Sequence, residues 1–434
     1  MKKSWLFAML WIFPLPLMAD PSAMMGGGNF YPDRLEQAQL RFDILNQIGA
    51  VKCRIAVSEN EYFTNSGTSH PEKLDDLILL AHKHNIEPML LFEYYTKWNG
   101  PLGGHDKWFH VGQAFAGRFA PNSLFLKSKG IENWGIRFYS AINEPMWKDN
   151  NPTPIDPNEY ASALEGLADG VHSVGKELRV SPGGFQEIPL LRTNHYGPVI
   201  ARLYNNGKLY AMDIHRYYDI QWQPMAGTYQ NSLQNQFDQV KKQWGITADI
   251  AFYTTEFNFK KRDITEQEAA RGFLTALWDA LGVTGNQGQP VTQFALPWNI
   301  FHTPGSDDHY GLTLKNTPWT PTLRGDVLRR VCQLTKGTHF TSLDPRQSGL
   351  FILQGNDKTI WVWQNLKGWT DRPGTSLTLK DLPEGTEKIE VHGFDGLRAT
   401  VDVKGRSDIQ IQHLIPEQTY MFVGYPNTLK QGRP

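Results

Sequence analysis

One rhythm governs most of this chain and limits the folds open to it. Between residue 23 and about residue 335, short runs rich in β-branched and aromatic residues alternate with amphipathic helical stretches. The runs lie at residues 23–30, 50–58, 87–95, 136–144, 178–185, 210–218, 249–259 and 292–301. Such alternation predicts an α/β fold with a parallel sheet, and eight strand and helix pairs fit a (β/α)8 TIM barrel with enlarged loops. A doubly wound open sheet is the alternative, although the first Gly-rich run lacks a GxGxxG fingerprint.

The pattern changes after residue 336. Residues 337–425 contain runs of alternating polar and apolar residues, such as GLFILQG and TIWVWQNL, separated by Gly, Pro and Asp turns. This period of two predicts antiparallel strands. We therefore expect a barrel over residues 20–336 and an accessory β-sandwich domain over residues 337–434.

The first residues have the form of an export leader. Lys2 and Lys3 precede an apolar run that ends at Met18, and the small residue Ala19 follows. An uncleaved membrane anchor is the alternative, but the run is short for a span and contains two prolines. We expect a signal peptide over residues 1–19, a periplasmic or secreted mature chain, and no membrane span after cleavage.

Composition excludes several classes of protein. With 434 residues, 40% of them hydrophobic and 12% aromatic, the chain can bury a large core and is not disordered. A formal net charge of −1 gives no indication of a nucleic-acid partner. The two cysteines, Cys53 and Cys332, allow one disulfide but no disulfide scaffold. Without a CxxC or HExxH motif, we expect neither a metal nor another cofactor.

Two glutamates at predicted strand ends carry the chemistry. Functional groups of such barrels lie at the C-terminal ends of the strands, where Asn143 and Glu144 end strand four and Glu256 ends the TTE of strand seven. Three βα units separate the glutamates and place them across the barrel mouth. Facing carboxylates suit the cleavage of a glycosidic bond, because one protonates the leaving oxygen while the other attacks the anomeric carbon or activates water. Either glutamate on its own would more simply cap a helix or face solvent.

Strand six offers side chains that fit this pair. Asp213, His215 and Tyr217 alternate in MDIHRYYD and therefore share one face of the strand. The phenol and the imidazole would hold the carboxylate of strand seven in place. Each of these residues would also be ordinary as a satisfied core residue.

Arg54 lies within predicted strand two among apolar neighbours, and a buried arginine must be paired. Pairing with Glu256 would keep that carboxylate ionised, while burial and the like charge raise the pKa of Glu144. A salt bridge to Glu93 is the alternative.

Aromatic residues gather in the predicted loops after the strands. Trp298 ends strand eight, where an indole face would form the floor beneath a sugar ring. We expect contacts with substrate from Trp98, Trp147 and Trp222, because loop aromatics suit the apolar faces of pyranose rings. Further aromatics placed in these loops are Tyr94, Tyr95, Trp108 and Trp319. About half of the whole set is expected to contact ligand, with the rest used in packing.

Taken together, these motifs resemble one group of enzymes. NEP at the end of strand four, Glu at the end of strand seven, HRY on strand six, Arg on strand two and Trp on strand eight look like the retaining (β/α)8 enzymes of glycoside hydrolase clan A. The trailing β-sandwich and the leader are most similar to family 39 and related bacterial exopolysaccharide glycosidases. Strand three, which ends in FEYY, lacks the histidine that some families of the clan place there.

The resemblance implies a role for each matching residue. Glu144 would be the general acid/base, Glu256 the nucleophile and Asn143 the donor to the sugar 2-hydroxyl. Tyr217 and Arg54 would be the partners of the nucleophile.

The resemblance also implies that His215 lines the subsite near the acid/base and that Trp298 forms the floor, with a cis peptide to Asn299. We expect a monomeric retaining β-glycosidase that hydrolyses a polysaccharide or oligosaccharide, and the long aromatic loops favour endo action. Two rivals stay open: a carbohydrate-binding barrel without turnover, and a transglycosylase.

Overall fold

The structure is a computed structural model. It describes residues 20–31, 34–64, 66–149, 151–186, 195–218, 232–261, 263–300, 310–314, 320–344, 349–366 and 373–426. The expected signal peptide at residues 1–19, and the predicted loop aromatics Trp222 and Trp319, lie outside these ranges.

Parallel strands occur where the sequence predicted them. They are β1 (Gly26–Phe30), β2 (Lys52–Ser58), β3 (Glu87–Glu93), β4 (Phe138–Ala141), β5 (Arg179–Pro182), β6 (Ala211–Asp213), β7 (Arg216–Tyr218), β8 (Ala251–Phe259) and β9 (Thr292–Pro297). The predicted strand six is two short strands, β6 and β7, both paired with β8. The break between them falls at Ile214 and His215.

The described strands do not form one continuous hydrogen-bonded barrel. β1 to β5 lie side by side in chain order in one parallel sheet, and β8 pairs with β6, β7 and β9 in another. Isolated parallel bridges connect the sheets, Met25 with Ala295 at one seam and Phe185 with Ile214 at the other. The prediction of parallel βα units is therefore confirmed, whereas a single closed ladder is not found among the described residues.

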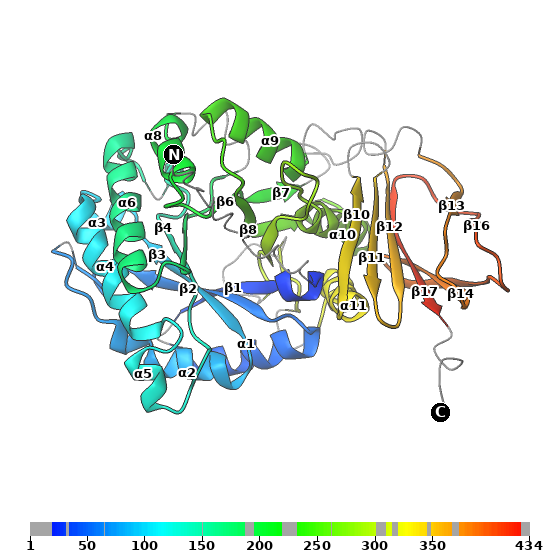
Figure 1. Cartoon of the computed structure of the whole chain (residues 1–434), viewed down its shortest axis with the longest axis horizontal. Coiled ribbons are helices and arrows are strands. Elements are labelled where there is room, and N and C mark those ends of the chain that lie inside the picture. Colours follow the sequence, from blue (N-terminus) through cyan, green and yellow to red (C-terminus); the bar gives the residue numbers. More distant parts are fainter. Residues whose placement is uncertain are drawn as a thin grey trace, which may run out of the picture.

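Helices cover the outside of the strands (Figure 1). They are η1 (Pro21–Met24), α1 (Leu35–Ile48), η2 (Pro71–Leu74), α2 (Asp75–Lys83), α3 (Thr96–Asn99), α4 (His105–Phe119), α5 (Leu124–Ser128), α6 (Pro157–Val174), α8 (Gly197–Asn205), α9 (Leu233–Trp244), α10 (Glu266–Leu281) and α11 (Leu323–Thr335). Ser232 and Thr265 cap α9 and α10 through side-chain oxygens that accept backbone N–H groups, and Gly49 and Gly245 end α1 and α9 in the left-handed conformation. Among the described residues, no helix combines the length and apolar character that a membrane span requires.

The space inside the ring of strands is filled below the C-terminal strand ends. Met89, Phe138, Tyr253 and Phe294 come from different strands and pack together there, with ring centroids 4.9 Å apart for Phe138 and Phe294. Because Met89 belongs to this inner plug, the alternation of side chains along β3 also directs Leu91 and Glu93 inward, with Glu93 at the C-terminal end of the strand. The outer faces of the strands contact the helices through a separate apolar core.

The C-terminal strands form a two-layer antiparallel unit. In the described residues, one sheet has the order β10 (Thr338–Asp344), β11 (Leu350–Gly355), β12 (Thr359–Asn365), β17 (Gln418–Pro426), β14 (Thr386–Gly393) and β15 (Gly396–Asp402), and the other consists of β13 (Leu377–Leu379) and β16 (Ile409–Ile411). Trp361 and Trp363 pack with Ile411 in the apolar layer that the two sheets share. These tryptophans are therefore core residues of the C-terminal unit.

The opposite face of the larger sheet packs on the barrel, beside α10 and α11 (Figure 1). Trp278 of α10 contacts Phe340 and Phe351, with ring centroids 6.4 and 6.1 Å away. The hydroxyls of Thr275 and Thr419 are hydrogen-bonded at 2.7 Å across the same boundary. The contact between barrel and sheet is thus largely apolar and buried.

Both cysteines are buried and free. Cys332 lies against Met25, with 3.6 Å between the two sulfur atoms. The disulfide that the sequence allowed is not formed.

Candidate active site

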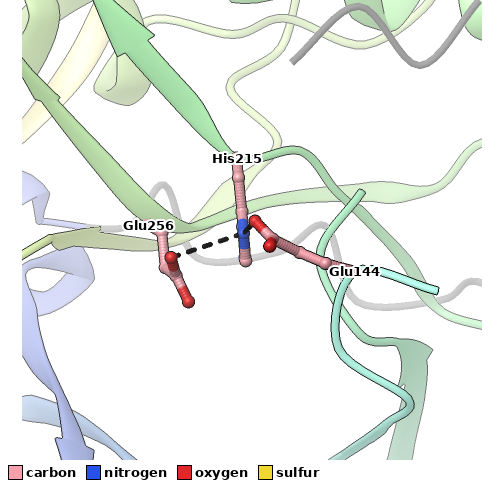
Figure 2. A group of neighbouring side chains, drawn as sticks. All are labelled: Glu144, His215 and Glu256. Atoms are coloured by element: carbon pink, nitrogen blue, oxygen red, sulfur yellow. Dashed lines mark hydrogen bonds and ion pairs between the residues drawn. The ribbon is translucent and has the colours of Figure 1, made fainter. Parts of the chain in front are cut away.

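Glu144 follows β4, where the backbone leaves the strand with unusual dihedral angles. Ile142 and Glu144 have φ values of 66° and 44°, a region that residues with a Cβ seldom occupy and β-branched residues avoid. The turn is fixed on both sides, because the Glu144 N–H donates to the Gly184 carbonyl and the Glu144 carbonyl accepts from the Trp147 N–H, each at 2.9 Å. Its side chain, 12% exposed, is directed towards His215 (Figure 2).

Two glycines after β5 make room for this arrangement. A Cβ atom on Gly184 would lie 1.8 Å from His215 Nε2, and one on Gly183 would lie 2.5 Å from the Ile142 carbonyl oxygen. Neither approach is possible for a residue with a side chain. The sequence SPGGF is therefore required by the packing around Glu144 and His215.

Glu256 faces the same space because β8 changes register. Tyr253 belongs to the inner plug, and strict alternation would also direct Phe257 inward, but Phe257 stacks on Phe273 of α10, outside the ring. The pairing of β8 with β9 shifts between Thr254 and Phe257. As a result the consecutive side chains of Thr255 and Glu256 both reach the interior, as irregular strands next to active sites often allow.

Arg54 connects these strand ends. Its Nη2 donates to Glu256 Oε1 at 2.5 Å, its Nη1 to Thr255 Oγ1 at 2.7 Å and its Nε to Asn29 Oδ1 at 2.6 Å. The predicted ion pair between Arg54 and Glu256 is confirmed. Glu93, the alternative partner, forms no ion pair with Arg54 in the described part of the chain.

His215 and Tyr217 complete the surroundings of the two glutamates. Tyr217 donates its hydroxyl to Glu256 Oε2 at 2.6 Å. His215 Nδ1 lies 2.7 Å from Glu144 Oε1 and 3.6 Å from Glu256 Oε2, so the buried imidazole stands between the two carboxyl groups (Figure 2). Asp213, the third residue of this predicted face, accepts from the Thr255 hydroxyl at 2.6 Å.

The environment shifts the pKa values of the two glutamates in opposite directions. Burial raises the pKa of Glu144, and the hydrogen bond from His215 offsets only part of that effect. Burial also acts to raise the pKa of Glu256, but the charges of His215 and Arg54, with the hydrogen bonds from Tyr217 and Arg54, outweigh it and lower this pKa. Glu144 therefore keeps its proton to a higher pH than Glu256 does, and acid/base chemistry requires such a difference between two carboxyl groups.

The donor atoms of Glu144, His215 and Glu256 all lie within 4.8 Å of one another. This spacing would also admit a metal ion. However, Arg54 already neutralises Glu256, and both oxygens of that carboxylate accept hydrogen bonds from the protein. We therefore interpret the group as an acid and base pair.

Two further residues predicted to contact a sugar, Asn143 and Trp298, adjoin the glutamates. Asn143 is buried, and its Oδ1 has no hydrogen-bond partner within the described ranges. Trp298 is half-buried, and its peptide bond to Asn299 is cis, as the resemblance implied. The Trp298 N–H donates to the Phe257 carbonyl at 2.9 Å, which ties this residue to β8.

The aromatic residues divide between the surface and the core. Trp98 is 62% exposed, and its ring meets the edge of Tyr95 at 5.4 Å. Trp147 is half-buried and lines a cavity of about 500 Å³ with Met146, Lys148 and Asp149. The placement of Trp108 in a loop is wrong: α4 begins at His105, and the first turn of this helix directs Trp108 into the core.

Sequence reasoning missed three contributors to the site. Asn29 and Thr255 hold Arg54 in place, and Glu93 ends β3 with its side chain directed inward. Glu93 was considered only as a salt-bridge partner, because the predicted strand three ran on to Tyr95 and concealed its true end. The rule that functional groups lie at strand ends would have found Glu93 if the strand had been ended two residues earlier.

The fold is shared with solved structures of glycoside hydrolases. A family 39 glycoside hydrolase from the gut symbiont Bacteroides cellulosilyticus has a TM-score of 0.59 at 14% identity, with 94% of this chain and 83% of that chain covered. A glucosidase from Croceicoccus marinus has a TM-score of 0.60 at 12% identity, covering 95% and 97%. A family 30 endoxylanase from Clostridium papyrosolvens has a TM-score of 0.56 at 14% identity, covering 89% and 92%.

At such low identities these likenesses bear on the fold alone. For the fold, they confirm the resemblance to clan A glycoside hydrolases, with family 39 among the similar structures. No protein-family model and no curated protein matches the sequence.

Proposed function

We propose that this protein is a retaining β-glycosidase that cleaves a polysaccharide, with Glu256 as nucleophile and Glu144 as general acid/base. The observation that carries the proposal is the closeness of two carboxyl groups with opposite pKa shifts: an oxygen of Glu144 and an oxygen of Glu256 lie within 4.8 Å. Retaining glycosidases hold their carboxyl groups about 5 to 5.5 Å apart, whereas inverting enzymes need about 6.5 to 9.5 Å to admit a water molecule.

In the first step, Glu144 gives its proton to the glycosidic oxygen while Glu256 attacks the anomeric carbon, so that the leaving group departs as an alcohol. Arg54 and Tyr217 keep Glu256 ionised and oriented for this attack. Asn143 adjoins Glu144 in the chain and would bind the same sugar, since its buried amide oxygen has no hydrogen-bond partner within the described ranges.

In the second step, Glu144 as carboxylate takes a proton from water, and the water oxygen attacks the anomeric carbon and releases Glu256. The structure favours this exchange of roles. The negative charge of Glu256 contributes to the raised pKa of Glu144, and that charge disappears when Glu256 becomes an ester. The pKa of Glu144 then falls, which suits its second role as a base.

Exposed aromatic residues bear on the substrate, and the first residues of the chain bear on its location. The exposed ring of Trp98 and the cavity lined by Trp147 would offer contacts to further sugar units, which supports endo action on a polymer. An endoxylanase is among the enzymes of similar fold. The leader-like residues 1–19 support a periplasmic or secreted enzyme, and a bacterial exopolysaccharide is the substrate that the resemblance favours.

Covalent trapping tests the proposal directly. Incubation with 2,4-dinitrophenyl 2-deoxy-2-fluoro-β-glycosides, followed by peptide mapping, should find one sugar residue attached to Glu256. The Glu256→Gln variant is the matched control and should take up no label. Hydrolysis products with inverted anomeric configuration, measured by proton NMR within the first minutes, would contradict the mechanism.

A further inference from the structure

Glu93 is a buried carboxyl group with few hydrogen-bond donors around it in the described part of the chain. It is 8% exposed, and within the described ranges its Oε1 accepts one long hydrogen bond, of 3.4 Å, from the Tyr95 hydroxyl. Among the described residues no ion pair reaches it. Its side chain points into the ring of strands, because Met89 lies on the same face of β3 and belongs to the inner plug.

Arg54, the cation of this network, is hydrogen-bonded to other residues. Arg54 directs Nε to Asn29, Nη1 to Thr255 and Nη2 to Glu256, and among the described residues it makes neither a hydrogen bond nor an ion pair to Glu93. Glu93 nevertheless shares the pocket with Arg54 and Glu256, since both charges act on it electrostatically. Burial raises the pKa of Glu93 to about 7.

Phenol groups line the same corner. Tyr95 donates to Glu93, and Tyr31 lies near enough for the charge of Glu93 to act on it. Burial, together with that charge, raises the pKa of Tyr31 to about 12, so it stays a neutral hydroxyl. The edge-on contact of Tyr95 with Trp98 connects this corner to the exposed rim.

A buried carboxylate without a counter-ion costs stability unless other donors reach it. Such groups occur in binding sites, where a ligand supplies the missing hydrogen bonds and where function is kept at some cost in stability. A carboxylate accepts hydrogen bonds only, so the ligand must supply hydrogen-bond donors. Sugar hydroxyls are donors of this kind, and the sugar attacked by Glu256 would lie next to Glu93.

On the basis of the proposed function, we infer that Glu93 is a specificity-determining residue that accepts hydrogen bonds from hydroxyl groups of the sugar unit bound at Glu256. The same residue excludes a uronic acid from that position. A uronate would bring a second carboxylate against Glu93, which has no counter-ion among the described residues. Two carboxylates held side by side repel each other strongly when water is excluded. The substrate class is therefore a neutral β-glycan, or one that is neutral at the cleaved unit.

The test uses the rate at which 2,4-dinitrophenyl 2-deoxy-2-fluoro-β-glycosides label Glu256. The best neutral glycoside is compared with its 3-, 4- and 6-deoxy analogues in the wild type, in Glu93→Ala and in Glu93→Gln. Loss of the hydroxyl that Glu93 binds should slow labelling of the wild type by about 10- to 100-fold, the usual effect of a hydrogen bond to a charged group. In Glu93→Ala, that penalty should shrink to nearly one.

This coupling separates recognition from a merely structural role, because a damaged fold would slow all analogues equally. Equal deoxygenation penalties in the wild type and Glu93→Ala would overturn the inference. Labelling of the wild type by the matching glucuronide as fast as by the neutral probe would also overturn it. The expected result is slow labelling by the glucuronide, with a relative gain in Glu93→Gln.

The two proposals fail in different ways. If no glycoside labels or is hydrolysed by the wild type, the proposed function falls, and the role of Glu93 falls with it. If Glu256 is labelled but no hydroxyl is coupled to Glu93, only the role of Glu93 is refuted.

Discussion

His215 and Glu144 are joined by a hydrogen bond of 2.7 Å between imidazole Nδ1 and carboxyl Oε1, and the imidazole is completely buried. His215 Nε2 lies 3.1 Å from the Thr255 hydroxyl on the other side of the ring. The position of the proposed acid is therefore set by His215, between β6 and β7, and by Thr255 of β8, as well as by the turn after its own strand β4. Any change that moves the imidazole should act on Glu144 before it acts on Glu256.

Glu144→Gln should separate substrates by their leaving groups. The amide cannot protonate the glycosidic oxygen, so cleavage of the natural polymer should fall by about 10²- to 10⁴-fold, the usual contribution of a general acid. Formation of the glycosyl-enzyme from a 2,4-dinitrophenyl glycoside needs no proton and should be nearly unaffected. Burst kinetics with this probe, beside steady-state kinetics with the polymer, provide the measurement, and an equal loss in both would exclude the role.

Gly184→Ala should lower activity by displacing His215, although Gly184 itself has no side chain in the site. The new Cβ would lie 1.8 Å from His215 Nε2, so the imidazole must move and Glu144 loses its partner. We expect kcat to fall at least tenfold, as misplacement by about 1 Å can cost far more. Gly117→Ala is the matched control, because Gly117 is exposed in α4 and a Cβ there meets no atom within 4 Å. Retained activity in Gly184→Ala would show that the imidazole is not needed where it lies.

The dependence of kcat/KM on pH should be bell-shaped. The rate falls at low pH as Glu256 gains a proton and at high pH as Glu144 loses one, since their pKa values are lowered and raised respectively. Tyr217→Phe removes a hydrogen bond that lowers the pKa of Glu256. The acidic limb of the profile should therefore move to higher pH in this variant. A profile with an unmoved acidic limb would argue against Glu256 as the group that titrates there.

Glu93→Gln should stabilise the protein above neutral pH. The pKa of Glu93 rises from an ordinary 4.5 to about 7 on folding, so the folded state holds the proton more tightly. Stability is consequently lost as pH increases from about 4.5 to about 7, by a cost on the order of 3 kcal/mol at most. Glutamine avoids this cost. Denaturant unfolding should show a gain for the variant at pH 8 and little difference at pH 4.5, and a loss at pH 8 would contradict the assignment of Glu93 as unpaired.

Periodicity located the strands, and the strand ends located the principal site residues. Glu144, Glu256 and Arg54 were found because each departs from the apolar pattern of its own strand. Features that depend on contacts between strands were not predictable in this way. The shift in β8 that directs both Thr255 and Glu256 inward is a property of its pairing with β9 and leaves no mark in the local sequence.

The errors have a common physical origin. Trp108 was placed in a loop because neither a side-chain cap nor a proline marks the start of α4; its N-cap is Gly104. Glu93 was passed over because Tyr94 and Tyr95 continue the β-rich composition past the last paired residue of β3. In both cases the amino-acid composition does not change at the end of the element, because backbone hydrogen bonds determine where a helix begins or a strand ends.

Helix α10 lies between β8 and the C-terminal sheet and packs against both (Figure 1). Phe273 stacks on Phe257 of β8, the residue after Glu256, and one turn further along the helix Trp278 packs on Phe340 and Phe351 of the C-terminal sheet. The strand that carries the proposed nucleophile thus packs against a helix that also contacts the C-terminal sheet. Deleting the C-terminal strands would therefore also remove packing contacts from α10, the helix against which the strand of the proposed nucleophile packs.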